Sequence, residues 1–581
     1  MTTHRRILPL LVISALGACA TGGDGGSVPR TTAEEASVGI ASADTSVLAR
    51  DAGTYAIEAE APPPVARGMQ TMVPPGDPGA ALPATSADAA GAPGREPDRE
   101  GYALIQENEF QDVVLHPLST FAIDVDAASY SNVRRFLGEG RLPPRDAVRI
   151  EELVNYFDYD YADPRGEHPF SIATEISVAP WNPAHRLVHV GLQGKRMEQG
   201  ELPPGNLVFL IDVSGSMDEP NKLPLVKRSM RMLVEQLRPQ DRVSIVVYAG
   251  AAGLVLEPTP GSRKDRIMAA IENLQAGGST AGGEGVVLAY QTARAGFIRG
   301  GNNRVILATD GDFNVGVSSD AELVRMIEEK RRQGIFLTVL GFGTGNYQDA
   351  KMEQLADHGN GNYAYVDGDA EARKVLVQEM GGTLLTIAKD VKVQVEFNPA
   401  RVKAYRLIGY ENRRLAAEDF HDDAKDAGEL GAGHSVTALY EVVPVGAPTP
   451  VRGAGPLRYQ EVSPRAGSRG RGELFTVKLR YKEPDGENSR LIEQPVLDRG
   501  LPLARTSDDF RFAAAVAEWG LLLRQSRFKG EATWAGVLAR ARGALGHDEH
   551  GYRREFVRMV EDSRRIAASE GGDSETLGGG F

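Results

Sequence analysis

One short stretch, residues 206–218 (NLVFLIDVSGSMD), constrains the fold of this chain more than any other part of it. Its apolar run, 207–211, has the length and composition of a strand buried on both faces of a parallel sheet. Asp212, Ser214 and Ser216 follow directly in a D-x-S-x-S spacing. Because open α/β sheets bind ligands beyond the carboxyl ends of their strands, this loop predicts a binding site.

Two further stretches place oxygen ligands in comparable positions. Thr280 lies in a glycine-rich loop that opens a helix, and Asp310 follows a second apolar strand (RVILATDGD). Oxygen-only ligands suit a hard divalent cation, with Mg²⁺ favoured and Mn²⁺ as the alternative. Asp and Ser also cap helices and form turns, so one spacing alone would be weak evidence. Three stretches together favour a metal site.

In the order and context of these motifs, the chain resembles a von Willebrand factor type A (VWA) domain with a metal-ion-dependent adhesion site (MIDAS). The resemblance implies that Ser214, Ser216 and Thr280 offer hydroxyl groups to the metal. It also implies that Asp212 and Asp310 act directly or through water, and that an Asp or Glu of a partner protein completes the coordination. Residues 117–161 (PLSTFAIDVDAASYSNVRRFLGEGRLPPRDAVRIEELVNYFDYDY) resemble the N-terminal module of the YfbK-like family of bacterial VWA lipoproteins, and this resemblance continues through the VWA domain to the C-terminus.

The N-terminus predicts a lipid anchor. Arg5 and Arg6 precede an apolar stretch, 7–18, that is too short to span a bilayer. Small residues then lead to Cys19, the only cysteine of the chain. This pattern resembles a bacterial lipobox, which implies cleavage before Cys19 and lipidation of its thiol; the alternative is a plain secretory signal peptide. Ala20 after the cysteine implies the outer membrane, so we expect a location in the bacterial cell envelope.

Composition narrows the function further. Residues 19–107 are rich in Ala, Gly, Pro, Thr and Ser, which predicts a disordered tether. No other stretch is long and apolar enough for a membrane-spanning helix, so the expected anchor is lipid alone. The net charge of −14 argues against a nucleic-acid-binding protein, which would need a basic stripe.

Hydrophobic periodicity predicts a multidomain α/β plus β protein. Strands and helices alternate in 203–388, as in a doubly wound, Rossmann-like sheet. The expected strands are 207–211, 242–248, 253–257, 304–309, 335–341 and 362–366. One helix is expected to begin at 222, and four others are expected to cover 263–274, 283–297, 320–333 and 370–388. Period-two alternation then predicts a β-sandwich in 389–502. We expect strands in 166–202 to join it, so that the VWA domain is an insertion; two independent β modules are the alternative.

The remaining segments complete the expected order of domains. A small helical region should cover 503–568, with Ser507 or Asp508 as the cap of its first helix. The other expected segments are a lipoprotein signal peptide (1–18), an N-terminal α/β module (108–165) and a disordered tail (569–581).

Three other motifs are candidates for catalytic or metal-binding sites. Asp124-x-Asp126 follows an apolar strand, as in the haloacid-dehalogenase phosphotransferases, but the rest of that pattern is missing and helix capping is favoured. His547 and His550 are spaced for one helix face, yet without a third ligand they favour surface residues over a zinc site. Ser216 has no G-x-S-x-G nucleophile elbow around it. We therefore expect a protein that is not an enzyme.

The expected function is that of a membrane-anchored adhesion or scaffold lipoprotein. Its VWA domain would recognise a partner carboxylate through the bound cation. One alternative is a metal-dependent hydrolase or phosphotransferase, in which the cation acts as a Lewis acid. The other is a structural envelope protein whose metal only stabilises the fold.

Overall fold

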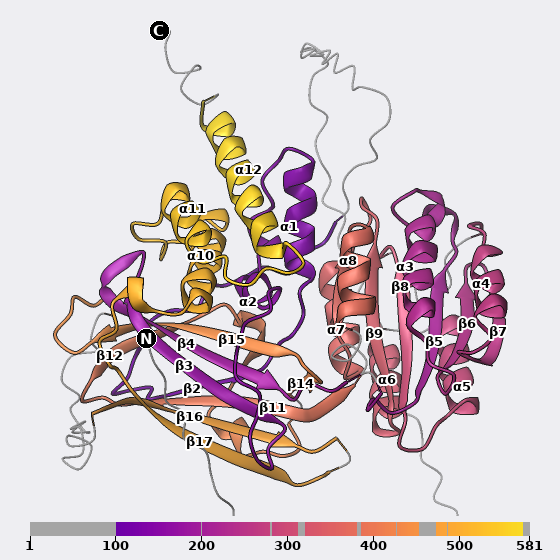
Figure 1. Ribbon diagram of the computed structural model, residues 1–581, viewed down its shortest axis with the longest axis horizontal. Coiled ribbons are helices and arrows are strands. Elements are labelled where there is room, and N and C mark those ends of the chain that lie inside the picture. Colours follow the sequence, from indigo (N-terminus) through magenta and orange to yellow (C-terminus); the bar gives the residue numbers. More distant parts are fainter. Residues whose placement is uncertain are drawn as a thin grey trace, which may run out of the picture. The chain divides into compact units, whose positions relative to one another are not determined.

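The computed structural model describes residues 100–198, 200–278, 282–311, 320–379, 385–425, 427–451, 472–484 and 486–572, all of them in one compact unit (Figure 1). Cys19, the expected signal peptide and Thr280 lie outside these residues, as do 573–581. Expectations that concern them stay predictions.

Part of the segment that the composition assigns to the tether belongs to the folded body. Residues 100–107, assigned to the tether, contact the body through backbone groups. Gly101 N donates to Tyr347 O at 3.0 Å, and Ile105 N donates to a carboxylate oxygen of Asp146 at 2.9 Å. Side chains hold the segment as well, because Tyr102 packs against the rings of Phe136 and Tyr347 and Glu100 pairs with Arg135. Composition could not reveal these contacts with distant residues.

The VWA domain is built on a sheet of six strands in the order β10-β9-β8-β5-β6-β7. All neighbouring pairs are parallel except β6 and β7. The strands are β5 (Gly205–Asp212), β6 (Arg242–Tyr248), β7 (Ala252–Pro260), β8 (Asn302–Thr309), β9 (Ile335–Phe342) and β10 (Tyr363–Val366). Every residue of β5 is buried, as expected for the central strand of a doubly wound sheet. The predicted fold class is confirmed.

Helices cover both faces of this sheet (Figure 1). They are α3 (Leu223–Gln236), α4 (Lys264–Glu272), α5 (Gly282–Ala295), α6 (Asp320–Arg332), α7 (Asp349–His358) and α8 (Asp369–Arg373), and α8 continues as a π-helical turn, η3 (Lys374–Gln378). Two helix predictions were wrong. The sequence predicts no helix at α7, and it predicts a last helix that reaches 388, although Thr386 already belongs to a strand.

The β-sandwich consists of two sheets that enclose one apolar core. The first sheet has the order β1 (Gln111–Asp112), β12 (Val402–Ile408), β15 (Ser435–Pro444), β4 (Asn182–Gly194) and β3 (Phe170–Ala179). The second has the order β13 (Arg414–Leu415), β2 (Leu118–Ala122), β11 (Thr386–Phe397), β16 (Glu473–Lys482) and β17 (Ser489–Leu497), and β14 (Gly428–Gly431) also pairs with β11. Since β4 pairs with β15 along its length, the VWA domain is an insertion between strands of one sandwich. The N-terminal segment also contributes β2, which pairs with β11.

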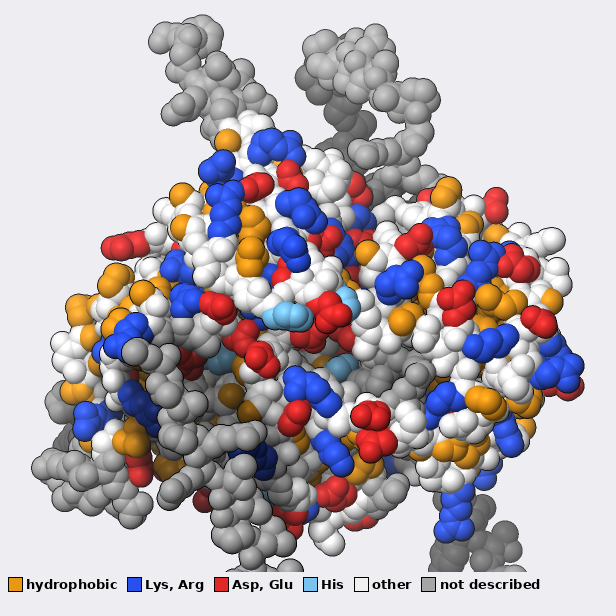
Figure 2. Space-filling view, in the orientation of Figure 1, with side chains coloured by type: hydrophobic (Ala, Val, Ile, Leu, Met, Phe, Trp, Pro, Cys, Tyr) orange, Lys and Arg blue, Asp and Glu red, His pale blue; other side chains and the backbone are white. Residues whose placement is uncertain are grey.

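A helical core joins the two ends of the described chain. It contains α1 (Ala128–Gly138), α2 (Ile150–Asn155), α10 (Asp508–Leu523), α11 (Trp534–Arg542) and α12 (Tyr552–Gly572). Ser507 caps α10, because its side chain accepts a hydrogen bond from Phe510 N. α12 runs to Gly572, beyond the start expected for the tail. Within the described ranges, none of the helices combines the length and apolar character that crossing a membrane requires. On the face shown in Figure 2, basic and acidic side chains are interspersed.

Candidate metal centre

Two buried carboxylates lie next to each other at the carboxyl edge of the VWA sheet. Asp212 ends β5, and Asp310 directly follows β8. The two strands are parallel neighbours, with Ile211 opposite Ala308. The exposed fraction of both Asp212 and Asp310 is 0%. The sheet register thus brings together two residues that are far apart in the sequence, at the edge where such sheets bind ligands.

The two serines of the motif add hydroxyl groups beside Asp212. Ser214 N donates to Asp212 Oδ1 at 2.8 Å, and the Oγ atoms of Ser214 and Ser216 are 3.1 Å apart. Ser214 is buried and Ser216 is exposed, so the group of oxygens reaches from the interior to the surface. A metal held here would remain accessible from outside through the side of Ser216.

The glycine-rich loop is tied to this loop by backbone hydrogen bonds. Gly277 N donates to Val213 O at 2.7 Å, and Gly215 N donates to Gly278 O at 3.1 Å. Gly278 has a φ of +90°, and a Cβ there would lie 3.3 Å from Ala249 Cβ, so the position favours glycine. Thr280 lies outside the described residues, between this tie and the start of α5.

The electrostatics of the site fit a hard cation. Burial raises the pKa of Asp212 to about 6; hydrogen bonds from Ser214 oppose this rise and the charge of Asp310 adds to it. A divalent ion would offset the cost of burying two carboxylates, and the donor set of carboxylates and hydroxyls suits Mg²⁺ or Mn²⁺. The structure adds a residue that the sequence analysis missed, because the buried Lys222 places its Nζ 3.1 Å from Asp310 Oδ2.

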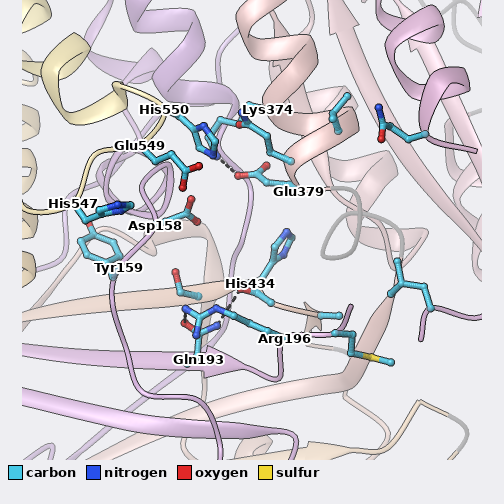
Figure 3. A pocket seen from close by; sticks show the side chains of 18 residues that line it. Asp158, Tyr159, Gln193, Arg196, Lys374, Glu379, His434, His547, Glu549 and His550 are labelled. Atoms are coloured by element: carbon cyan, nitrogen blue, oxygen red, sulfur yellow. Dashed lines mark hydrogen bonds and ion pairs between the residues drawn. The ribbon is translucent and has the colours of Figure 1, made fainter. Parts of the chain in front are cut away.

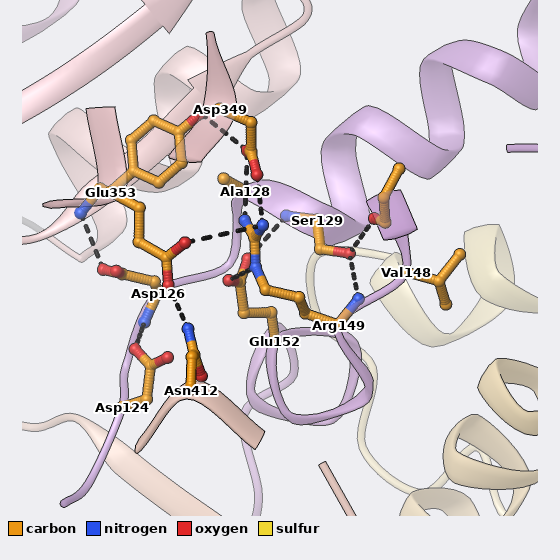
Figure 4. A network of polar contacts seen from close by, with 12 residues as sticks. Asp124, Asp126, Ala128, Ser129, Val148, Arg149, Glu152, Asp349, Glu353 and Asn412 are labelled. Atoms are coloured by element: carbon orange, nitrogen blue, oxygen red, sulfur yellow. Dashed lines mark hydrogen bonds and ion pairs between the residues drawn. The ribbon is translucent and has the colours of Figure 1, made fainter. Parts of the chain in front are cut away.

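Asp124 and Asp126 belong to a different site, a buried polar network (Figure 4). The expectation that they cap a helix was wrong: the cap of α1 is Ala127, with no side-chain hydrogen bond. Asp126 Oδ1 instead accepts a hydrogen bond from Tyr363 N at 2.7 Å, and Asp124 Oδ2 lies 3.1 Å from Arg413 Nε. The two aspartates link the N-terminal segment to both the VWA domain and the sandwich.

Two arginines neutralise the carboxylates of this network. Arg149 is paired with Asp349 of α7 and with Glu152 of α2. Arg413 of the sandwich lies 2.7 Å from a carboxylate oxygen of Asp357 and 3.6 Å from one of Glu353, both on α7. Oxygens of Asp124, Glu152 and Glu353 come within 4.8 Å of one another, which is compatible with a metal ion. Because guanidinium groups already contact these carboxylates, we interpret the network as a structural junction.

The network predicts a dependence of stability on pH. Burial raises the pKa of Glu152 to about 8 and that of Glu353 to about 7, against the opposing charge of Arg149. The folded protein therefore keeps protons that the unfolded chain releases above about pH 4.5. This contribution to the free energy of unfolding is complete at low pH and is lost as the pH rises to about 8.

We expect the unfolding midpoint in urea to fall between pH 6.5 and 8.5, and Glu152→Gln to reduce that fall. His189 and His434 are also buried, and burial lowers their pKa values to about 4. Their titration therefore changes the stability below pH 6.5 and not in this range. Glu257→Gln, at an exposed position of the VWA domain, should leave the pH profile unchanged. A Glu152→Gln protein with the wild-type profile would contradict the assignment.

His547 and His550 do not lie on one helix face. They belong to the loop between α11 and α12 and line a cavity of about 710 Å³ (Figure 3). His434 of the sandwich lines the same cavity, and its Nδ1 has no hydrogen-bond partner among the described residues. Lys374 and Glu379 contribute from the end of the VWA domain. Within the described ranges these histidines do not group as metal ligands.

Comparison with known proteins assigns most of the chain. Residues 96–189 match the model of the family described as von Willebrand factor, 206–379 that of the von Willebrand factor type A domain, and 382–566 that of the C-terminal region of the uncharacterized protein YfbK. Uncharacterized protein YfbK of Escherichia coli (strain K12) is 46% identical over 472 residues, which are 80% of this chain and 81% of that protein.

Solved structures match with low overall similarity. A von Willebrand factor type A protein from Catenulispora acidiphila is 17% identical and covers 69% of this chain and 91% of its own, with a TM-score of 0.37. Proximal thread matrix protein 1 from the mussel byssus, described with a zinc-occupied MIDAS motif, is 23% identical over 30% of this chain and 45% of its own, with a TM-score of 0.25.

VWA domains in general mediate interactions between proteins, and they commonly bind a divalent metal at the MIDAS. The strand order, the family models and the long match to a relative agree with one another. This chain therefore belongs to the YfbK-like family of bacterial proteins with a von Willebrand factor type A domain.

Proposed function

We propose that this chain is a lipid-anchored protein of the bacterial cell envelope that binds a partner protein through a divalent cation. Asp212, Ser214, Ser216, Thr280 and Asp310 would hold the cation, with Mg²⁺ favoured over Mn²⁺. A carboxylate of an Asp or Glu of the partner would complete its coordination. Cys19 would carry the lipid, and the expected location is the outer membrane.

One observation carries the proposal: two fully buried carboxylates meet at the strand edge, beside hydroxyl groups that reach the surface. Lys222 offsets only one of these two negative charges, and burying the other is costly without a further cation. Mg²⁺ prefers octahedral coordination by oxygen and usually keeps exchangeable waters. Exposure at Ser216 would let a group of a partner protein replace one of them.

A binding role is favoured over catalysis, and we propose that the chain is not an enzyme. Catalysis by a serine would require a base within hydrogen-bond distance of the nucleophile. The hydroxyl of Ser214 instead contacts that of Ser216, and in the described part of the site no histidine hydrogen-bonds to either serine. A cation would hold both hydroxyls as ligands, and it would not supply the missing base.

The proposal predicts capture of a partner that depends on metal and on Asp310. The full chain, tagged at its C-terminus, would be used in pull-downs from an envelope extract with Mg²⁺, with EDTA, and as Asp310→Ala with Mg²⁺. We expect a partner in the first sample and at least a tenfold loss in the other two, because both remove the bridging cation. Quantitative mass spectrometry of the captured proteins is the measurement.

Asp265→Ala is the matched control, because Asp265 is an exposed carboxylate of the same domain on α4. It should capture as much partner as the wild type. Equal capture in all samples would reject the metal-dependent interaction. Mg²⁺-dependent stability without any Mg²⁺-dependent capture would favour a purely structural metal instead.

A further inference from the structure

A buried lysine lies inside the candidate metal centre. The exposed fraction of Lys222 is 3%, and its Nζ lies 3.1 Å from Asp310 Oδ2. The same ammonium is 3.5 Å from Asn346 Oδ1 and 3.9 Å from a carboxylate oxygen of Glu219, whose side chain is 60% exposed. The close partner of this cation is thus a residue of the metal motif, which itself is fully buried.

The fold holds this lysine in place along its whole length. Lys222 directly precedes α3, so its backbone is fixed by the start of that helix. Its aliphatic part passes Gly343, where a Cβ would lie 2.5 Å from Lys222 Cγ and from Lys222 Cε. Gly343 also has a φ of +76°, a conformation that favours glycine. The ammonium is therefore a built component of the site and not a mobile surface charge.

Lys222 changes the charge that a bound cation would experience. Asp212 and Asp310 would together balance a divalent ion completely, and the loaded site would then have no net charge. With the ammonium on Asp310, the same site keeps one net positive charge. In a buried environment this difference matters, because charges interact more strongly there than in water.

We propose that Lys222 is a fixed internal cation of the metal centre that weakens metal binding and reserves a positive charge for the carboxylate of the partner. This inference rests on the proposed function and adds a specificity-determining residue to it. Repulsion between the ammonium and the metal lowers the affinity for the metal. The retained charge favours an anionic ligand on the loaded site over a neutral one such as water.

The test compares Lys222→Met with Lys227→Met in the full chain. Methionine keeps the length that packs on Gly343 and removes the charge. Lys227 is on α3, the helix that Lys222 precedes, and its Nζ donates to the backbone oxygen of Glu272, away from the motif. Isothermal titration with Mg²⁺ and with Mn²⁺ should show at least tenfold tighter binding by Lys222→Met and no change in Lys227→Met.

A second titration tests whether the loaded site binds a carboxylate, with acetate in place of the partner's side chain. Chloride is replaced by acetate at constant ionic strength, and the apparent affinity for Mg²⁺ is measured again. Acetate that binds the loaded site must tighten Mg²⁺ binding by linkage. We expect this tightening in the wild type. In Lys222→Met, acetate should change the logarithm of the apparent Mg²⁺ affinity by at most half as much. An equal effect in both proteins would overturn the inference.

The remaining outcomes separate the inference from the proposed function. A folded Lys222→Met protein with unchanged or weaker metal binding would overturn the role of Lys222 alone. A wild type that binds neither metal would reject the metal-dependent function together with the inference. If Lys222→Met does not fold, Lys222→Gln takes its place in both titrations, because glutamine removes the charge and keeps a hydrogen-bond donor for Asp310. Removal of the ammonium should again tighten Mg²⁺ binding, and no tightening would overturn the inference.

Discussion

Replacing Arg149 by leucine should destabilise the body by about 3–5 kcal/mol, the range for breaking a buried ion pair by removing one partner. The exposed fraction of Arg149 is 5%, and its guanidinium contacts Asp349 and Glu152 (Figure 4). Leucine would leave the carboxylate of Asp349 buried without this partner, and the carboxyl group of Glu152 would lose its hydrogen-bond donor. Because Asp349 is on α7 and Glu152 is on α2, the loss should weaken the junction between the VWA domain and the N-terminal segment.

The measurement is urea unfolding followed by tryptophan fluorescence. Trp181 and Trp519 are buried in the helical core, so their emission reports the loss of that core. Arg228→Leu is the control, because Arg228 pairs with Asp369 at 2.8 Å with side chains that are 42% and 55% exposed. Such exposed pairs contribute about 0–1 kcal/mol. A cost below about 1 kcal/mol for Arg149→Leu would show that the network does not hold the parts together.

Hydrogen exchange of α7 provides a second readout of the same change. If Arg149 anchors this helix, the amides of Asp349–His358 should exchange faster in Arg149→Leu than in the wild type, because the free energy of local opening becomes smaller. The amides of β5, the buried centre of the VWA sheet, should be affected much less. Uniformly faster exchange in both elements would indicate a global loss of stability instead of a weakened junction.

The parts of the fold that could be predicted are those with a local signal. The apolar run before Asp212 and the one before Asp310 each predicted a strand, and both are buried parallel strands of one sheet. The structure adds that these two strands are direct neighbours, which the sequence analysis did not predict. The period-two segments of the sandwich were likewise predictable, because one face of each strand must be apolar.

Contacts between distant segments could not be predicted from one sequence. Lys222 at the start of a helix is typical of a solvent-exposed residue, and only the packing at Gly343 reveals that its ammonium is directed inward. Asp124 and Asp126 have the local pattern of helix caps, yet their partner Arg413 follows the whole VWA insertion in the sequence. Pairs of this kind depend on tertiary packing, which leaves no periodicity in the sequence.

Asp212→Asn should have two opposite effects on stability. In the metal-free protein it should raise the free energy of unfolding above pH 6, because it removes a carboxylate that burial makes costly to ionise. The pKa of Asp212 is raised to about 6 from 3.8. A shift of this size corresponds to on the order of 2–3 kcal/mol. The gain should shrink as the pH falls to about 4, where the folded wild type is protonated.

With Mg²⁺ the same substitution should be harmful, because asparagine cannot provide the charge that holds the cation. A ligand at one hundred times its dissociation constant stabilises the folded state by about 2.7 kcal/mol. The wild type should gain this amount at saturating Mg²⁺, and Asp212→Asn should gain nothing. Thermal unfolding with EDTA and with Mg²⁺, at pH 7.5 and pH 5, measures both effects.

Asp265→Asn, at the exposed position on α4, should behave as the wild type in every condition. The opposite signs make the test independent of general damage to the fold, since a damaged protein would lose stability with and without metal. An Asp212→Asn protein that is less stable than the wild type in EDTA would mean that the ionised carboxylate supports the metal-free fold. A shift with Mg²⁺ that survives the substitution would place the cation elsewhere in the molecule.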